Sequence, residues 1–212
     1  MTRSGLDALL ASGVIAVVRA RDSVGLSAVA RALTAGGVSA VEITLTTPGA
    51  TEAIAELSRD GVAPGAVIGA GTVLDVTAAG EVIAAGARFV VSPTLEPAVI
   101  RLCRDRDIPC VAGAFTPTEM LAAWRAGASL VKLFPASAVS PGFLRDVLAP
   151  LPFLRVVPSG GISLANAAAW IRAGAVAVST GSALLGAADV TAEARTFVAA
   201  VAAARRPPER AS

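Results

Sequence analysis

The chain has 212 residues and a formal net charge of +2, and 54% of its residues are hydrophobic whereas only 16% are charged. This balance excludes a nucleic-acid-binding protein built on a basic stripe, and the lack of an unbroken run of about 18 apolar residues excludes a membrane span. Histidine is absent, so a Ser-His-Asp triad, a Cys-His pair and His-based zinc or iron sites are excluded as well.

The apolar segments predict eight strands that alternate with helices. A lead-in helix is expected at 4–12, then a strand at 14–18, a helix at 23–35, a strand at 40–45, a helix after Pro48, a strand at 66–72 and a helix at 76–85. The other strands are expected at 89–93, 109–115, 130–135, 155–161 and 175–182, with helices between and after them. Eight βα units in about 200 residues predict a closed (β/α)8 TIM barrel, because a doubly wound open sheet normally needs fewer strands.

One domain is expected, because parallel barrels of this size commonly form a single domain. We expect it to span residues 1–204, followed by a frayed tail at 205–212. The N-terminal segment lacks the basic start, apolar core and cleavage site of a secretory signal, so a cytoplasmic enzyme is expected. Cys103 and Cys110 have neither the number nor the spacing of a metal site or a disulfide framework, and we expect them to be core thiols.

Lys132 is the only lysine among 18 basic residues, and it lies in the apolar run from Ser129 to Pro135. A primary amine in a low-dielectric site loses part of its affinity for protons and becomes nucleophilic near neutral pH. It can then condense with a ketone to a Schiff base, which arginine cannot do. The structural alternative is a lysine that snorkels from a strand end or pairs with a buried carboxylate.

Glu42 is expected to face Lys132 inside the barrel. Side chains alternate along a strand, so Lys132 shares its inward face with Leu130 and Phe134, and Glu42 shares the inward face of the second strand with Thr44. The two strands lie on opposite sides of an eight-stranded ring, so an amine and a proton-transferring carboxylate meet across its mouth. A purely structural ion pair is the alternative, although buried pairs rarely improve stability over apolar packing.

Glycine-rich segments follow the seventh and eighth strands, at Pro158-Ser-Gly-Gly-Ile162 and Ser179-Thr-Gly-Ser182. Loops after these two strands often bind phosphate in barrels, where backbone N–H groups and a helix N-terminus meet the anion. The two segments therefore predict a phosphate site. Arg19 and Gly69-Ala-Gly-Thr72 also end strands at the mouth, although a surface charge and a tight turn are their structural alternatives.

Together these segments resemble the 2-keto-3-deoxy-6-phosphogluconate (KDPG) aldolases. This family of class I lyases also includes the 2-keto-4-hydroxyglutarate (KHG) and 2-dehydro-3-deoxy-6-phosphogalactonate (KDPGal) aldolases. The resemblance runs from about residue 10 to residue 200. It rests, in chain order, on Val41-Glu-Ile-Thr-Leu, Gly69-Ala-Gly-Thr-Val, Val91-Ser-Pro, Thr116-Pro-Thr-Glu, Val131-Lys-Leu-Phe-Pro-Ala, Pro158-Ser-Gly-Gly-Ile and Thr180-Gly-Ser.

The resemblance implies a homotrimeric barrel without metal or other cofactor, which acts on a keto-deoxy sugar acid phosphate and releases pyruvate. It implies that Lys132 forms the Schiff base, that Glu42 transfers protons and that Arg19 assists in binding an anionic group. The further substrate-binding residues that it implies are Thr72, Pro93 and Phe134 in the pyruvate pocket, and Ser159, Gly160, Gly161, Gly181 and Ser182 at the phosphate.

The implied reaction cleaves KDPG to pyruvate and glyceraldehyde 3-phosphate, in carbohydrate metabolism of the Entner–Doudoroff type. The same chemistry on KDPGal or on 4-hydroxy-2-oxoglutarate is an alternative, because several family members carry an arginine near the substrate carboxylate where this chain has Thr46. Ser159 stands in place of the usual threonine and keeps its hydroxyl. Two further alternatives are a phosphosugar isomerase without covalent catalysis and a non-catalytic metabolite-binding barrel, because this fold hosts many functions.

Overall fold

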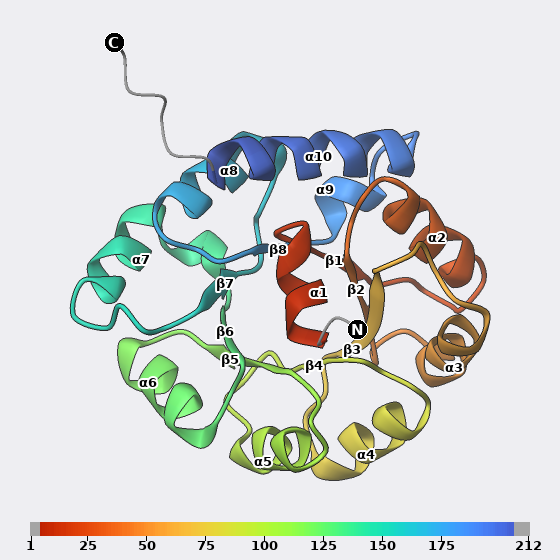
Figure 1. Ribbon diagram of the computed structural model, residues 1–212, viewed down its shortest axis with the longest axis horizontal. Coiled ribbons are helices and arrows are strands. Elements are labelled where there is room, and N and C mark those ends of the chain that lie inside the picture. The colour runs from red at the N-terminus through yellow and green to blue at the C-terminus, as the bar shows by residue number, and fades with distance from the viewer. Residues whose placement is uncertain (1–4, 206–212) are drawn as a thin grey trace.

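Parallel strands form the centre of the molecule in the computed structural model, which describes residues 5–205 (Figure 1). Within this range there are eight strands, and each pairs in parallel with its neighbour in the chain, up to β7, while β1 also pairs with β8. Their bounds are β1 Val14–Val18, β2 Ala40–Thr44, β3 Val67–Gly71, β4 Val90–Val91, β5 Cys110–Ala114, β6 Leu130–Leu133, β7 Val156–Pro158 and β8 Val178–Thr180.

The ring closes between β7 and β8. A parallel bridge joins Ser159 to Ser179, and the backbone N–H of Val176 donates to the carbonyl of Val156 over 3.0 Å. The prediction of a (β/α)8 barrel is therefore confirmed. The seventh strand ends at Pro158 rather than at 161, because Gly160 and Gly161 take φ values of +89° and +74°, which leave the extended region.

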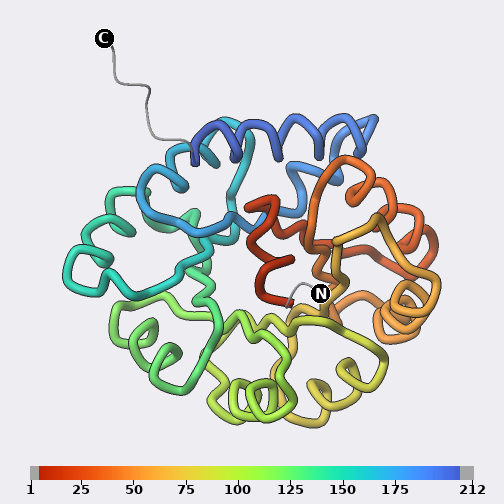
Figure 2. The backbone as a smooth tube through the Cα atoms, in the orientation of Figure 1, coloured from red at the N-terminus to blue at the C-terminus, as the bar shows by residue number. Residues whose placement is uncertain are grey.

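Helices surround the strands as a ring (Figure 2). The predicted lead-in helix is confirmed as α1, whereas α2 begins at Leu26, three residues later than expected, because Gly25 before it takes a left-handed φ of +79°. The helix bounds are α1 Gly5–Ala11, α2 Leu26–Ala35, α3 Ala50–Asp60, α4 Val76–Ala84, α5 Pro97–Asp105, α6 Pro117–Ala126, α7 Pro141–Leu148, α8 Leu164–Arg172, α9 Ser182–Leu185 and α10 Val190–Arg205, with a 3₁₀ turn η1 at Ala136–Ala138.

The barrel has an apolar interior at the end where the strands begin. Helix α1 lies across this end in Figure 1, and its Leu9 is fully buried. Inward side chains of the strands, and of the residues just before β4 and β8, pack with it. Because these side chains fill the ring and α1 covers it, this end of the barrel is closed. The cluster consists of Leu9, Ile15, Ala40, Phe89, Val91, Val111, Leu130, Val157 and Ala177.

The side chains that alternate with this cluster pack against the surrounding helices. Val41, Ile43 and Val131 belong to the larger apolar cluster outside the ring, together with residues of the helices. Leu130 and Ala40 belong to the inner cluster. The predicted alternation of inward and outward side chains is therefore confirmed on these two strands.

Arg205 corrects the expected boundary of the tail. It is the last residue of α10, and its guanidinium donates hydrogen bonds to the carbonyls of Leu10, over 2.9 Å, and of Val176. Burial lowers the pKa of Arg205 from its ordinary value. This residue therefore ties the C-terminal helix to α1, while 206–212, the rest of the expected tail, lie outside the described residues.

Cys103 and Cys110 are buried free thiols in α5 and β5, in agreement with the expected core role. A side-chain hydrogen bond with Cys103 and burial raise the pKa of Cys110, so it stays a thiol. Among residues 5–205 no helix is long and apolar enough to cross a membrane.

Candidate active site

A cavity of about 550 Å³ opens at the end of the barrel opposite α1. Its walls come from residues at or just after the carboxyl ends of the strands, which is where barrel enzymes carry their active sites. All eleven site residues predicted from the sequence line this cavity: Arg19, Glu42, Thr72, Pro93, Lys132, Phe134, Ser159, Gly160, Gly161, Gly181 and Ser182. Six other residues line it: Ile162, Ser179 and Thr180, which belong to the two predicted phosphate segments, and Val17, Leu185 and Gly186, which no sequence pattern indicated.

Lys132 and Glu42 meet inside the cavity. Lys132 Nζ lies 3.6 Å from Glu42 Oε1, and the two residues are only 7% and 1% exposed. The ammonium also lies 5.6 Å from the ring centroid of Phe134, within the range of a cation–π contact. The second carboxylate oxygen of Glu42, Oε2, is buried without a hydrogen-bond partner among the described residues. It is therefore free to accept a proton or a hydrogen bond from a ligand.

Inward-facing glycines make room for these groups. A Cβ on Gly71 would overlap the carboxylate of Glu42, and a Cβ on Gly113 would overlap the backbone of Pro93. Gly113 is also the register partner of Lys132 on the neighbouring strand. The barrel mouth is open because glycines on β3 and β5 replace the bulky side chains that fill its other end.

Thr72 follows β3 with a φ of +59°, in the left-handed region. A β-branched residue rarely adopts this conformation, and such strain is concentrated at functional sites. Hydrogen bonds hold the backbone on both sides of it: the Gly71 carbonyl accepts from Leu45 N over 2.8 Å, and Val73 N donates to the Val91 carbonyl over 3.1 Å. Thr72 is thus fixed at the cavity wall by the adjacent strands.

The two predicted phosphate segments lie side by side. Thr180 Oγ1 donates to the carbonyl of Ile162 over 2.8 Å, which links the segment after β8 to the segment after β7. The side chain of Asn166, in the first turn of α8, donates to the Gly161 carbonyl over 2.9 Å. Glycines with positive φ leave no side chain between the backbone of the β7 segment and the cavity. This arrangement suits an anion that binds to backbone N–H groups.

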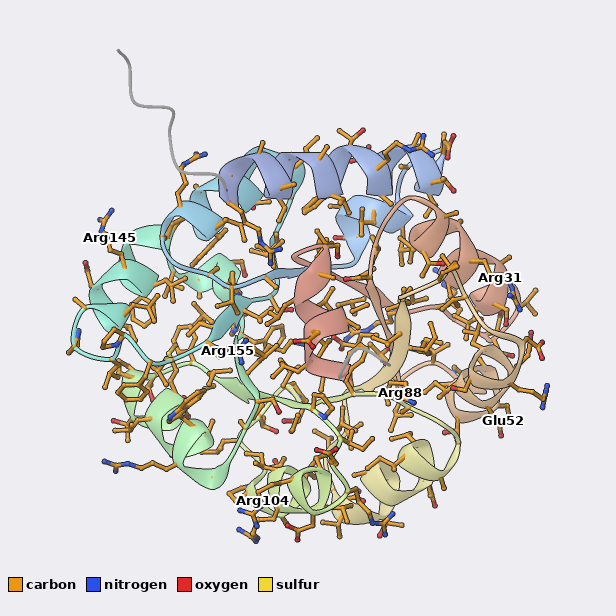
Figure 3. All side chains as sticks on the ribbon, viewed as in Figure 1. Arg31, Glu52, Arg88, Arg104, Arg145 and Arg155 are labelled. Atoms are coloured by element: carbon orange, nitrogen blue, oxygen red, sulfur yellow. The ribbon has the colours of Figure 1, made fainter. Side chains whose placement is uncertain are left out.

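Of the basic residues within 5–205, two line the cavity, the buried Lys132 and the exposed Arg19. Other arginines that the structure describes lie elsewhere: Arg88 and Arg155 come just before β4 and β7, at the opposite end of the barrel, and Arg145 lies on the outer ring of helices (Figure 3). The cavity therefore combines one buried amine with one solvent-accessible guanidinium, which favours an anionic ligand.

Thr46 does not line the cavity. Its hydroxyl lies 3.0 Å from the hydroxyl of Thr44, and the neighbouring Thr47 accepts a hydrogen bond of 3.1 Å from the backbone N–H of Ala20. These threonines connect the end of β2 to the segment that carries Arg19. Among residues 5–205, no three His, Cys, Asp or Glu side chains gather closely enough to hold a metal ion.

Comparison with known proteins agrees with this geometry. The sequence model of the family described as KDPG and KHG aldolase matches residues 7–201. A probable KDPGal aldolase from Rhizobium meliloti is 43% identical over 121 residues, which are 57% of each chain. The matched part thus spans little more than half the length of this curated relative.

Solved structures match over nearly the whole chain. A structure described as native KDPGal has a TM-score of 0.84 at 33% identity, and the match covers 90% of this chain and 95% of that one. The KDPG aldolase from Legionella pneumophila, with pyruvate captured as a covalent carbinolamine, has a TM-score of 0.76 at 27% identity and covers 96% and 99%. The chain belongs to the KDPG and KHG aldolase family.

Proposed function

We propose that the chain is a class I aldolase that cleaves KDPG to pyruvate and glyceraldehyde 3-phosphate. The observation that carries this proposal is the contact of 3.6 Å between the only lysine of the chain and a buried carboxylate, inside the cavity at the barrel mouth. The captured pyruvate carbinolamine of the Legionella pneumophila enzyme supports the same chemistry.

The covalent step begins at Lys132. Its neutral amine attacks the C2 ketone of KDPG, and Glu42 helps to move protons as the carbinolamine forms and loses water. The product is a protonated imine between Nζ and C2. This imine accepts the electron pair of the bond that breaks next, so it takes the place of a free carbanion.

Cleavage then uses the free oxygen of Glu42. Glu42 Oε2 accepts the proton of the C4 hydroxyl, the C4 oxygen becomes the aldehyde carbonyl, and the electrons of the C3–C4 bond move into the imine. Glyceraldehyde 3-phosphate leaves an enamine on Lys132. Protonation at C3 and hydrolysis of the resulting imine release pyruvate and regenerate the amine.

The other predicted site residues bind the two ends of the substrate. Thr72, Pro93 and Phe134 surround the pyruvate half, and Arg19 assists with its carboxylate. Ser159, Gly160, Gly161, Gly181 and Ser182 receive the phosphate. We further propose that the protein is cytoplasmic and that it is a homotrimer, as the resemblance implies; its mass in solution can be measured by sedimentation equilibrium.

The same chemistry on KDPGal is the second candidate, because the Rhizobium meliloti relative is a probable KDPGal aldolase. The two substrates differ only in configuration at C4, the carbon whose hydroxyl loses its proton to Glu42. Cleavage rates of the wild-type protein on KDPG, KDPGal and 4-hydroxy-2-oxoglutarate decide between them.

Borohydride reduction in the presence of pyruvate tests the proposal. A pyruvyl adduct on the peptide with Lys132, detected by mass spectrometry, is expected from the wild-type protein and not from Lys132→Arg. Turnover without an adduct would instead support an isomerase, and a folded protein with neither would support a binding barrel. Appreciable aldolase activity of Lys132→Arg would contradict the assignment, because arginine cannot form the imine.

A further inference from the structure

The proposed mechanism leaves one buried polar group of the cavity without a use. Among the described residues, Glu42 Oε2 and Ser179 Oγ are the buried side-chain polar atoms without a hydrogen-bond partner. Both residues line the cavity. A buried hydroxyl without a partner costs about 1–3 kcal/mol, so a group that enters the cavity is expected to satisfy it.

Ser179 is placed by the closure of the barrel. It is 2% exposed, pairs in register with Ile15 of β1, and forms the bridge to Ser159 beyond β7. The hydroxyl of the next residue, Thr180, has a structural partner in the carbonyl of Ile162. The hydroxyl of Thr180 therefore stabilises the fold, whereas the adjacent hydroxyl of Ser179 is available to bind a ligand.

The position of Ser179 indicates which part of the substrate it meets. It is the first residue of the predicted phosphate segment 179–182, and its bridge partner Ser159 belongs to the other predicted segment, so it lies where the two segments meet. In KDPG the reacting ketone is C2, the phosphate is on C6, and the hydroxyls between them are on C4 and C5. The C4 hydroxyl is used by Glu42, so the C5 hydroxyl, next to the phosphate-bearing carbon, needs a partner.

We infer that Ser179 is a substrate-binding residue whose hydroxyl forms a hydrogen bond with the C5 hydroxyl of the sugar acid. This inference rests on the proposed aldolase function. The C5 hydroxyl becomes the 2-hydroxyl of glyceraldehyde 3-phosphate, so Ser179 recognises the aldehyde half of the reaction. It therefore favours acceptors that carry this hydroxyl over phosphorylated aldehydes that lack it.

The test uses the reverse reaction, in which pyruvate adds to an aldehyde. Wild-type protein and Ser179→Ala are assayed with glyceraldehyde 3-phosphate and with 3-oxopropyl phosphate, which lacks the 2-hydroxyl. Loss of one hydrogen bond is expected to lower kcat/KM of the variant about tenfold with glyceraldehyde 3-phosphate, and to change it less than about twofold with 3-oxopropyl phosphate. Equal losses with both aldehydes, or no loss with either, would overturn the inference.

Stability provides a second measurement. Because the hydroxyl has no hydrogen-bond partner among the described residues, Ser179→Ala is expected to keep or raise the Tm. A clear fall in Tm would show that the hydroxyl has a structural role and would also overturn the inference. Ser129→Ala is the matched control, since it removes a hydroxyl that accepts from Cys110 N at the start of β6, away from the cavity; its kcat/KM should be unchanged.

Trapping of pyruvate distinguishes a failure of the proposed aldolase function from a failure of the proposed role of Ser179. Borohydride trapping of pyruvate on Lys132 is expected to be the same in Ser179→Ala and in the wild-type protein, because pyruvate carries no C5 hydroxyl. If the wild-type protein neither traps pyruvate nor cleaves KDPG, the proposed function fails. If it does both and Ser179→Ala lowers kcat/KM equally with the two aldehydes, or with neither of them, only the role of Ser179 fails.

Discussion

The two ends of the barrel are made from the same strands but have opposite interiors. At the end that α1 covers, the inward side chains of Ala40, Leu130 and Ala177 belong to a closed apolar cluster. Two residues further along the same strands, the inward positions are Glu42, Lys132 and Ser179, and they line an open cavity. Two residues along a strand, the spacing between successive inward side chains, therefore separate the packed end from the polar end.

This difference between the two ends indicates how the fold tolerates a site that lowers its stability. Burial of an amine and a carboxylate is unfavourable compared with apolar packing, and the apolar cluster at the other end stabilises the strands that carry them. Stability and chemistry are thus expected to respond to different substitutions on the same strand. Substitutions at the two ends of the barrel test this separation.

Glu42→Gln is expected to act on chemistry alone. Because the amide cannot accept the proton of the C4 hydroxyl, kcat for KDPG cleavage should fall about 10²–10⁴-fold. Stopped assays of aldehyde release measure this loss. Glu52→Gln is the matched control, since Glu52 lies on the outside of α3 (Figure 3) and its loss should leave kcat unchanged. A similar fall in the control would refute a specific role for Glu42.

Leu130→Ala is expected to act on stability alone. This residue lies two positions before Lys132 on β6 and is fully buried in the closed end, so its truncation should cost about 2–5 kcal/mol of unfolding free energy. Urea unfolding measures the cost. Pyruvate trapping on Lys132 should persist below the unfolding transition. If trapping were lost while stability was retained, the two ends would not be separable.

Gly71→Ala tests the space around Glu42. A Cβ at this position would overlap the Glu42 carboxylate, and a displacement of about 1 Å in a catalytic group can lower kcat about 10²-fold. Gly80→Ala is the control, because a Cβ on this glycine of α4 meets no other atom within 4 Å. An unchanged kcat in Gly71→Ala would mean that the carboxylate can move without loss of function.

The sequence was sufficient to predict the architecture, because each βα unit carries its own apolar pattern and turn residues. It also placed Glu42 and Lys132 on inward faces, since alternation along a strand is a local property. The register between strands is not local. The need for glycine at position 71 beside Glu42 and the unsatisfied hydroxyl of Ser179 depend on which residues neighbouring strands bring together.

The same reason explains the missed role of Arg205, whose partner Leu10 lies at the other end of the sequence. The left-handed φ of Thr72 was not predictable either, because a threonine gives no local signal for that conformation. Ser179 lies in a predicted phosphate segment, and its own role had a further signal: it is a polar residue at an inward position of β8, two residues after Ala177 of the apolar cluster.

The smallest effect is expected from Glu119, a polar residue after β5 that serves structure rather than chemistry. Its Oε2 accepts hydrogen bonds of 2.8 Å from the backbone N–H groups of Phe115 and Thr116, and Thr116 Oγ1 accepts from Glu119 N over 3.2 Å, which completes a capping box at the start of α6. The hydrogen bonds from the Thr116 and Phe115 backbone lower the pKa of Glu119 from its ordinary value of 4.5.

Because the folded pKa of Glu119 is below the unfolded one, the charged form stabilises the protein. This contribution is complete well above pH 4.5 and is lost as the pH falls through the lowered folded value. Glu119→Gln should therefore cost less than about 1 kcal/mol at pH 7, since the group is at the surface, and the difference from wild type in urea unfolding should shrink toward pH 3. A difference in unfolding free energy that does not change with pH would show that the shape of the side chain, and not its charge, stabilises the capping box. A fall in kcat of Glu119→Gln at pH 7 would show that residues outside the cavity contribute to catalysis.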